Sequence, residues 1–265
     1  MKNLLINEIM KRYGTVKRAR DCFLYTAKGV RLTDLYMEGG RAVLGWGKGS
    51  AVTVFKNVLE RKLLGTYFET DFSPKISDEK NQLAKAVSQL FGEERKVFAF
   101  YSKSEAEKTA ESAGEKACTF IPWNQENIDW REKNAIVMAP PFPFGDFIWI
   151  LAVKPDVNVN SENSTFRIPA PLCAAFTRSI YDLIRELQNR EEKNWFIYDT
   201  VVTKYWTRKG PYLFPKVPES KYEDFMIHCL ENELVISPDY NVPSIIPFGA
   251  DKGNFSKLKN NPFEF

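Results

Sequence analysis

The sequence predicts an α/β protein from three observations. Short apolar runs at 96–101, 118–121, 135–139 and 147–153 are typical of buried strands. Amphipathic helical patterns alternate with these runs at 78–91, 104–116 and 171–190. The chain has 265 residues, of which 44% are hydrophobic, enough for a packed core in one or two domains. The alternation of strand and helix indicates a sheet with at least some parallel strands.

The remaining segments predict a smaller part that combines helices with antiparallel strands. Residues 3–13 form an expected helix with Leu4, Leu5 and Ile9 on one side, which would pack on the body or on a second subunit. Strands follow from Cys22 onward and turn at Lys28-Gly29. Further along the chain the pattern predicts helices at 50–64 and 220–232, and strands at 234–236 and 244–248.

Charge and composition restrict the class of partner. Lys plus Arg number 37 and Asp plus Glu number 34, so the net charge is +3 and nucleic acid is an unlikely partner. The four cysteines lie far apart and do not form the close pairs of a zinc or redox site. The N-terminal region has no signal-peptide pattern, and no segment has the ~20 apolar residues of a membrane span. We therefore expect reduced core thiols, no membrane association and a cytoplasmic location.

A local basic run occupies residues 11–20. It contains Lys11, Arg12, Lys17, Arg18 and Arg20 and has no acidic residue. Such a run could contact phosphate or a membrane surface. Short basic runs of this kind are common, so a solvated face is the favoured interpretation.

Three segments carry a resemblance to a known family. Residues 29–36, GVRLTDLY, are followed by Gly39-Gly40 and Leu44-Gly45, and residues 101–106 read YSKSEA. The tail from Lys209 to Gly249 adds a strand, a helix and a second short strand. In this order the segments resemble class III aminotransferases, which are pyridoxal-phosphate enzymes of fold type I. Trp46 stands where that family often has a histidine, and Lys103 replaces a glycine of its phosphate turn.

The resemblance implies a reduced fold-type-I architecture. A discontinuous small α+β domain, residues 1–70 and 192–265, would enclose an abbreviated α/β domain, residues 71–191. Only residues 117–194 stand where the family places most of its cofactor-binding domain, including the Schiff-base lysine and the aspartate behind the pyridine nitrogen. The resemblance also implies a homodimer, because fold-type-I enzymes build their sites at a subunit interface.

The candidate site residues are few. Asp146 and Lys154 flank the strand at 147–153 and are the best surrogates for the missing aspartate and lysine, although both also fit ordinary turns. A phosphorylated or carboxylate ligand could bind near Ser102, Ser104, Arg208 and Lys209. Ser102 also begins a capping box, which needs no ligand.

Two other patterns favour structural interpretations. Residues 45–50, GWGKGS, fit neither the Walker spacing nor the dinucleotide fingerprint, so we interpret them as a turn. His228 is the only histidine, which excludes a histidine metal cluster and favours a boundary or surface position.

The sequence leaves three functional hypotheses. The first is a noncatalytic or altered relative of class III aminotransferases, without pyridoxal-phosphate chemistry and with a binding or assembly role. The second is an active enzyme that binds an anionic ligand between the two domains. The third is a basic adaptor for nucleic acid or membrane, based on residues 11–20. Pyridoxal phosphate is possible in this scheme but not favoured, and no metal is expected.

Overall fold

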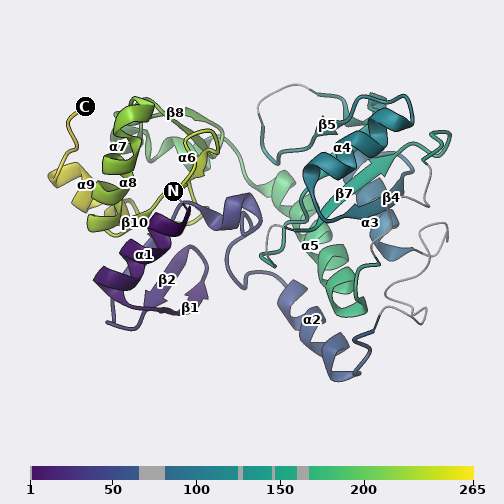
Figure 1. Ribbon diagram of the computed structural model, residues 1–265, viewed down its shortest axis with the longest axis horizontal. Helices are drawn as coiled ribbons and strands as arrows, with labels where there is room; N and C mark the ends of the chain where they lie inside the picture. The colour runs from purple at the N-terminus through teal and green to yellow at the C-terminus, as the bar shows by residue number, and fades with distance from the viewer. Residues whose placement is uncertain (1, 66–80, 125–127, 145–146, 160–166) are drawn as a thin grey trace. The chain divides into compact units, whose positions relative to one another are not determined.

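The computed structural model describes residues 2–65, 81–124, 128–144, 147–159 and 167–265 (Figure 1). The chain forms two compact units, and both chain ends contribute to unit 1. Unit 1 comprises Met1–Lys48, Trp123–Gln125 and Asn189–Phe265, and unit 2 comprises Gly49–Pro122 and Glu126–Gln188. The sequence predicts a first small-domain segment that ends at residue 70, whereas the first segment of unit 1 ends at Lys48. The reason for the difference is helix α2, Ala51–Glu60, whose buried Val58 packs with Ala170 and Ala174 of unit 2.

Unit 1 contains a four-stranded sheet in the order β1-β2-β3-β10. The first three strands are antiparallel, and β10 joins β3 in parallel, so the two chain ends share one sheet. Helix α1 places Leu5 and Ile9 in the core of unit 1, which agrees with its predicted apolar side. The bounds are α1 Lys2–Tyr13, β1 Val16–Arg20, β2 Phe23–Thr26, β3 Arg31–Asp34 and β10 Leu234–Val235.

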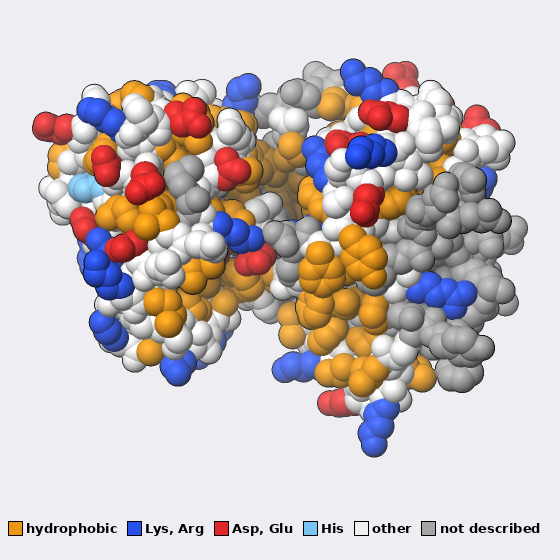
Figure 2. Space-filling view, viewed as in Figure 1, with side chains coloured by type: hydrophobic (Ala, Val, Ile, Leu, Met, Phe, Trp, Pro, Cys, Tyr) orange, Lys and Arg blue, Asp and Glu red, His pale blue; other side chains and the backbone are white. Residues whose placement is uncertain are grey.

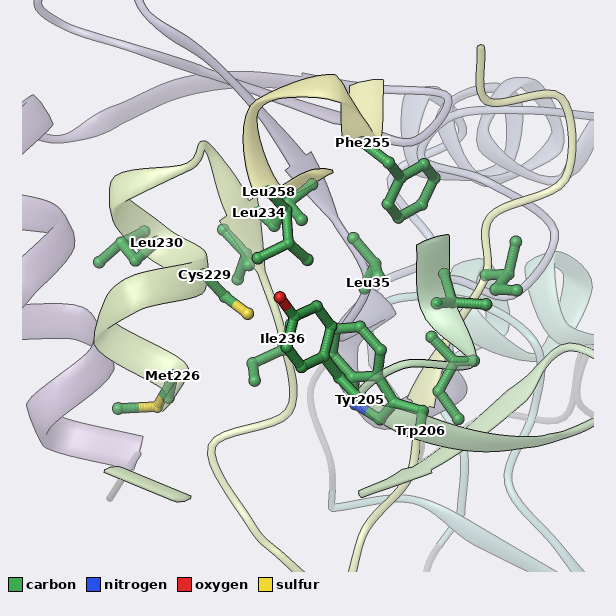
Figure 3. Close-up of a cluster of buried hydrophobic side chains, with 14 of the residues drawn as sticks. Leu35, Tyr205, Trp206, Met226, Cys229, Leu230, Leu234, Ile236, Phe255 and Leu258 are labelled. Atoms are coloured by element: carbon green, nitrogen blue, oxygen red, sulfur yellow. The ribbon is translucent and has the colours of Figure 1, made fainter. Parts of the chain in front are cut away.

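A second sheet and several helices complete unit 1. The sheet has the order β11-β9-β8, with all pairs antiparallel. The core of unit 1 is rich in large side chains, and Figure 3 shows Tyr205 and Trp206 in one buried cluster with Cys229 and Met226 of α8. The bounds are α6 Lys193–Phe196, α7 Asp199–Val202, β8 Trp206–Lys209, β9 Tyr212–Pro215, α8 Tyr222–Glu231, β11 Ser244–Ile245 and α9 Ser256–Asn260.

A buried carboxylate organises the turn after β3. One oxygen of Asp34 accepts the backbone N–H groups of Tyr36 and Met37, both at 2.9 Å, and the other accepts the indole N–H of Trp46 at 2.7 Å. The backbone then runs through left-handed φ values from Met37 to Gly40. Burial raises the pKa of Asp34 and outweighs the three hydrogen bonds, which lower it. The glycine pair and Trp46 of the aminotransferase-like motif therefore belong to one structural turn.

Unit 2 is built on a sheet with the order β4-β7-β6-β5. Strand β7 is antiparallel to both of its neighbours, and β5 is parallel to β6, so β4, β5 and β6 all run in the same direction. The predicted α/β class, with partly parallel strands, is confirmed. The bounds are α2 Ala51–Glu60, α3 Gln82–Phe91, β4 Lys96–Phe100, α4 Lys103–Ser112, β5 Cys118–Thr119, β6 Ala135–Met138, β7 Trp149–Val153 and α5 Ala170–Asn189.

Both faces of this sheet are buried. Alternate residues of β4, β6 and β7 pack with α3 and α5 on one face and with α4 on the other. Val97 and Ala99 of β4, for example, belong to the first cluster, and Phe98 and Phe100 belong to the second. Burial on two faces explains why these strands are continuous apolar runs rather than alternating patterns.

Candidate functional site

The strand directions define one edge of the unit 2 sheet as the place for a ligand. In open α/β sheets ligands bind beyond the carboxyl ends of the parallel strands. Strands β4, β5 and β6 end at this edge with Phe100, Thr119 and Met138. The antiparallel strand β7 begins there with Trp149, which is paired with Phe100. We call this place the carboxyl edge, and Ser102 and Ser104 lie there.

Ser102 is the N-cap of α4. Its hydroxyl oxygen accepts the backbone N–H of Glu105 at 3.2 Å, as the capping-box interpretation requires. Ser104 is exposed in the first turn of the helix. Lys103 stands between the two serines, and its ammonium lies 3.3 Å from the carboxylate of Glu107. This helix start is stabilised by its own side chains.

The connection between β6 and β7 at the same edge is apolar. Its described residues, 139–144 and 147–148, read APPFPF and FI and contain no lysine, histidine or carboxylate. Phe144 and Phe147 are 39% and 42% exposed, with ring centroids 6.2 Å apart. The ring of Phe55 in α2 lies 6.0 Å from that of Phe144. These described residues offer no group that could act as a nucleophile or a general base.

The exposed apolar surface of this connection continues onto α2. Leu59 lies one helical turn beyond Phe55 and is 41% exposed. We define Phe55, Leu59, Phe144 and Phe147 as the α2 patch. Figure 2 shows hydrophobic side chains gathered in this region of unit 2. Exposed apolar surface of this kind marks sites of association in soluble proteins.

Lys154 lies at the opposite edge of the sheet. Val153 pairs with Lys96 and Ala135, the first residues of β4 and β6. Four residue steps along β7 separate Val153 from Trp149, about 13 Å at the usual rise of a strand. The Lys154 ammonium lies 3.6 Å from the Glu93 carboxylate. Asp146, its suggested partner, lies outside the described residues.

Arg208 and Lys209 belong to β8 in unit 1, whereas Ser102 and Ser104 belong to unit 2. Arg208 donates to the Asp199 carboxylate at 2.5 and 3.0 Å, to the Gly210 carbonyl at 2.8 Å and to Glu192. The hydrogen bonds that Arg208 donates to Asp199 and Glu192 raise the pKa of Arg208 despite its burial. An added anion would compete with two carboxylates for this guanidinium. Lys209 is exposed, and its ammonium lies 5.7 Å from the centre of the Phe214 ring.

The glycine-rich loop at 45–50 leads into α2, where a protein carboxylate occupies the helix start. Asp182 of α5 accepts the backbone N–H of Ser50 at 3.1 Å. A Cβ atom on Gly49 would lie 2.5 Å from the same carboxylate oxygen, so only glycine leaves room for it. Asp182 therefore holds the position that a phosphate would take at this helix N-terminus.

The remaining chemically active side chains have structural surroundings. His228 is half-buried, and its Nε2 lies 2.8 Å from the carbonyl oxygen of Asn261. Among the residues that the structure describes, no group of three His, Cys, Asp or Glu side chains could hold a metal ion. In the same part of the chain, no helix is long and apolar enough to cross a membrane.

Comparisons with known proteins extend these observations. No family model matches the chain. An uncharacterized protein of Treponema pallidum (strain Nichols) is 26% identical, with 91% of each chain covered. An uncharacterized protein of Borreliella burgdorferi is also 26% identical and covers 92% of this chain and 89% of its own.

Solved aminotransferase structures share the fold. The ornithine aminotransferase of Plasmodium yoelii has a TM-score of 0.66 at 13% identity, covering 98% of this chain and 97% of its own. The acetylornithine aminotransferase of Elizabethkingia anophelis has a TM-score of 0.68 at 11% identity, with 96% of each chain covered. The ornithine aminotransferase of Toxoplasma gondii, described with partial occupancy of PLP at its active site, has a TM-score of 0.65 at 10% identity, covering 92% of this chain and 87% of its own. This chain thus has an aminotransferase-like fold, as the three sequence segments indicated.

Sequence reasoning missed three arrangements that depend on distant contacts. Asp182 caps α2 across 132 residues. Asp34 joins Trp46 within the family-like motif. Phe23 and Tyr25 lie beside the basic run once β1 and β2 pair. Only the last arrangement had a local signal. Residues 18 and 20, and residues 23 and 25, are spaced two apart, as residues on one face of a hairpin are.

Proposed function

We propose that this protein uses an aminotransferase-like fold without pyridoxal-phosphate chemistry and acts by binding or assembly. The observation that carries the proposal is the chemistry of the carboxyl edge. The described connection between β6 and β7 supplies aromatic and proline side chains there, and the candidate lysine, Lys154, follows the far end of β7. The described residues of this connection provide no amine to form a Schiff base, and Lys103, at the start of α4, is paired with Glu107.

The described residues also do not fit the cofactor's phosphate and ring. At the start of α4 the Ser102 hydroxyl oxygen already accepts a backbone N–H, and Lys103 places a paired side chain where the family turn has glycine. A carboxylate that keeps the pyridine nitrogen protonated is not found among the described residues of the connection. We therefore assign no reaction step to pyridoxal phosphate.

Borohydride trapping tests this part of the proposal. The protein is mixed with a near-stoichiometric amount of pyridoxal phosphate, reduced, digested and mapped by mass spectrometry. We expect low labelling spread over many exposed lysines, because the described residues form no site that favours one amine. The Lys154→Ala variant is the matched control and should give the same pattern. Stoichiometric labelling of one lysine, lost together with the absorbance band when that lysine is replaced, would contradict the proposal.

The assembly role is supported by the α2 patch. Its exposed side chains, Leu59, Phe144 and Phe147, come from a helix and a loop that contact each other through Phe55. Aromatic residues are enriched at protein interfaces. We propose that two copies of the chain associate through this patch to form a homodimer. A stable interface requires about 1,000 Å² or more of buried area, so residues around the patch would take part.

Light scattering coupled to gel filtration tests the assembly. The Phe144→Ser/Phe147→Ser variant should shift the mass from dimer to monomer at micromolar concentration, because each serine removes apolar area from the patch. The matched control is Phe196→Ser, which changes a side chain of unit 1 that is 62% exposed. A monomeric wild-type protein, or an equal shift in the control, would count against the α2 patch as the interface.

A further inference from the structure

The four-stranded sheet of unit 1 presents a face on which arginine and aromatic side chains alternate across strands. Arg18 of β1 is paired with Tyr25 of β2, which is paired with Arg31 of β3. In the adjacent row, Arg20 is paired with Phe23. Directly paired residues point to the same side of a sheet, so these five side chains share one face. We call it the arginine–aromatic face.

The arginines of this face stack on the aromatic rings. The guanidinium carbon of Arg18 lies 4.2 Å from the centre of the Tyr25 ring, and that of Arg31 lies 4.2 Å from the centre of the Phe23 ring. Both rings are half-buried and both arginines are exposed. Each guanidinium carbon thus lies over a ring, and the exposed arginine keeps N–H donors near solvent. An exposed guanidinium is also available to a further stacked ring.

The charge on this face is positive and largely uncompensated. Among the described residues, neither Arg18 nor Arg31 forms an ion pair with a carboxylate, and Arg20 lies 3.5 Å from Asp21. Figure 2 shows Lys and Arg side chains along the lower-left margin of unit 1, in the region of α1, β1 and β2. A ligand of this face should carry negative charge as well as a planar group.

A polar cavity adjoins the face. It has a volume of about 430 Å³ and is lined by Arg31 and Thr33 of β3 together with Glu233, Asn254 and Lys257. The Nδ2 atom of Asn254 is buried and has no hydrogen-bond acceptor among the described residues. The Lys257 ammonium lies 2.5 Å from Glu233. Arg31 therefore borders a polar cavity that also contains the paired side chains of Lys257 and Glu233.

We propose that the arginine–aromatic face binds a nucleotide unit of single-stranded nucleic acid. A base would stack on the guanidinium of Arg18 or Arg31, and a phosphate would accept hydrogen bonds from the same arginines. Sheet faces that combine aromatic and basic side chains use these interactions in single-strand recognition. The pairing of β1 with β2 places Tyr25 and Phe23 beside Arg18 and Arg20 of the basic run.

A membrane surface fits this face less well. Interfacial binding requires exposed apolar side chains that enter the lipid. Here the two aromatic rings lie beneath guanidinium groups, and the exposed large apolar side chain of β1 is Val16 alone. The inference uses unit 1 only, so it does not depend on the proposed loss of pyridoxal-phosphate chemistry.

Fluorescence anisotropy with a labelled thymidylate octamer tests the proposal on the full-length protein. The Arg18→Gln/Arg31→Gln variant should bind at least about tenfold more weakly than wild type. The matched control is Lys204→Gln/Lys209→Gln, which removes the same charge and also removes cations that lie over aromatic rings of unit 1. The control should change the affinity less than about twofold, and thermal melting should show that both variants are folded.

A second variant separates stacking from charge. Tyr25→Leu keeps every arginine and a β-compatible apolar residue, so it should weaken binding while the salt dependence stays unchanged. With three arginines on phosphates, the logarithm of the binding constant should fall against the logarithm of salt concentration with a slope of about −2. A Tyr25→Leu variant that binds as tightly as wild type would remove base stacking from the proposal and overturn it.

Competitors identify the source of the nucleotide. Displacement by thymidine monophosphate would mean that one nucleotide suffices, whereas displacement only by unlabelled octamer would require a strand; both outcomes support a nucleotide site. Equal displacement by inorganic phosphate would overturn the proposal in favour of a simple anion site. Equal competition by phosphatidylserine vesicles would overturn it in favour of a membrane surface. Absence of octamer binding at low salt, or equal weakening by the lysine control, would also refute it.

Discussion

Asp182 provides a direct test of how unit 2 is held together, because one carboxylate connects α5 to the start of α2. Its side chain is 3% exposed and accepts the Ser50 N–H at 3.1 Å. Its other oxygen lies 3.0 Å from Arg178 and 3.3 Å from Arg185. The Asp182→Ala substitution removes the acceptor at the helix N-terminus and both ion pairs together.

The expected magnitude follows from these contacts. A hydrogen bond to a charged acceptor contributes about 1.5–3 kcal/mol to stability. The two arginine side chains are 38% and 53% exposed, so solvent screening limits each ion pair to roughly 0.3–0.5 kcal/mol. The sum is about 2–4 kcal/mol, which corresponds to roughly a hundredfold change in a local opening equilibrium.

Hydrogen exchange measured by mass spectrometry locates the effect. Peptides that cover α2 should exchange roughly a hundredfold faster in Asp182→Ala, while peptides from α8 in unit 1 should stay unchanged. Arg185→Ala is the control and should change α2 exchange by less than about threefold, because it removes one exposed pair only. An α2 effect no larger than that of Arg185→Ala would refute the proposed connection.

Three further predictions follow from buried groups. Burial raises the pKa of Asp34, so the stability that this side chain contributes is present at acidic pH and is lost as pH rises through its folded-state pKa. The free energy of unfolding of wild type relative to Asp34→Asn, measured with urea from pH 4 to 8, should therefore fall as pH rises. A constant or rising difference would contradict this prediction. Gly49→Ala should accelerate α2 exchange as Asp182→Ala does, since its Cβ would meet the Asp182 carboxylate at a φ of +79°; unchanged exchange would argue against that contact. Burial raises the pKa of three thiols, Cys22, Cys173 and Cys229, so a thiol reagent should label Cys118 first. The Cys118→Ser substitution should remove this fast phase of labelling, and a fast phase that survives would contradict the assignment.

Local sequence pattern was sufficient for most elements of unit 2. The runs that predict β4, β6 and β7 are apolar throughout, without alternating polar residues, because both faces of these strands are covered. Such a run identifies a buried strand even when the strands it pairs with are unknown. The sheet order was not available from the sequence. It places β7 between β6, which precedes it along the chain, and β4, whose paired residues lie about 50–57 positions earlier.

The candidate site shows the same limit. Ser102 was correctly assigned as a helix cap because its hydroxyl oxygen accepts the backbone N–H of Glu105, only three residues away. Lys154 was a reasonable candidate at a strand end, but only the antiparallel direction of β7 reveals that this end lies away from the carboxyl edge. Asp182 is one of many helix acids in the sequence, and nothing local distinguishes it from a surface residue.

The two proposed binding surfaces can be separated by experiment because they use different units. The arginine–aromatic face belongs to unit 1, and the α2 patch belongs to unit 2. If assembly and nucleotide binding are independent, Phe144→Ser/Phe147→Ser should leave octamer affinity per chain unchanged, and Arg18→Gln/Arg31→Gln should leave the mass unchanged. If instead the monomeric variant binds more weakly, thermodynamic reciprocity requires the octamer to promote dimer formation by the same factor. Measuring both quantities on both variants therefore decides whether assembly serves binding or stands apart from it.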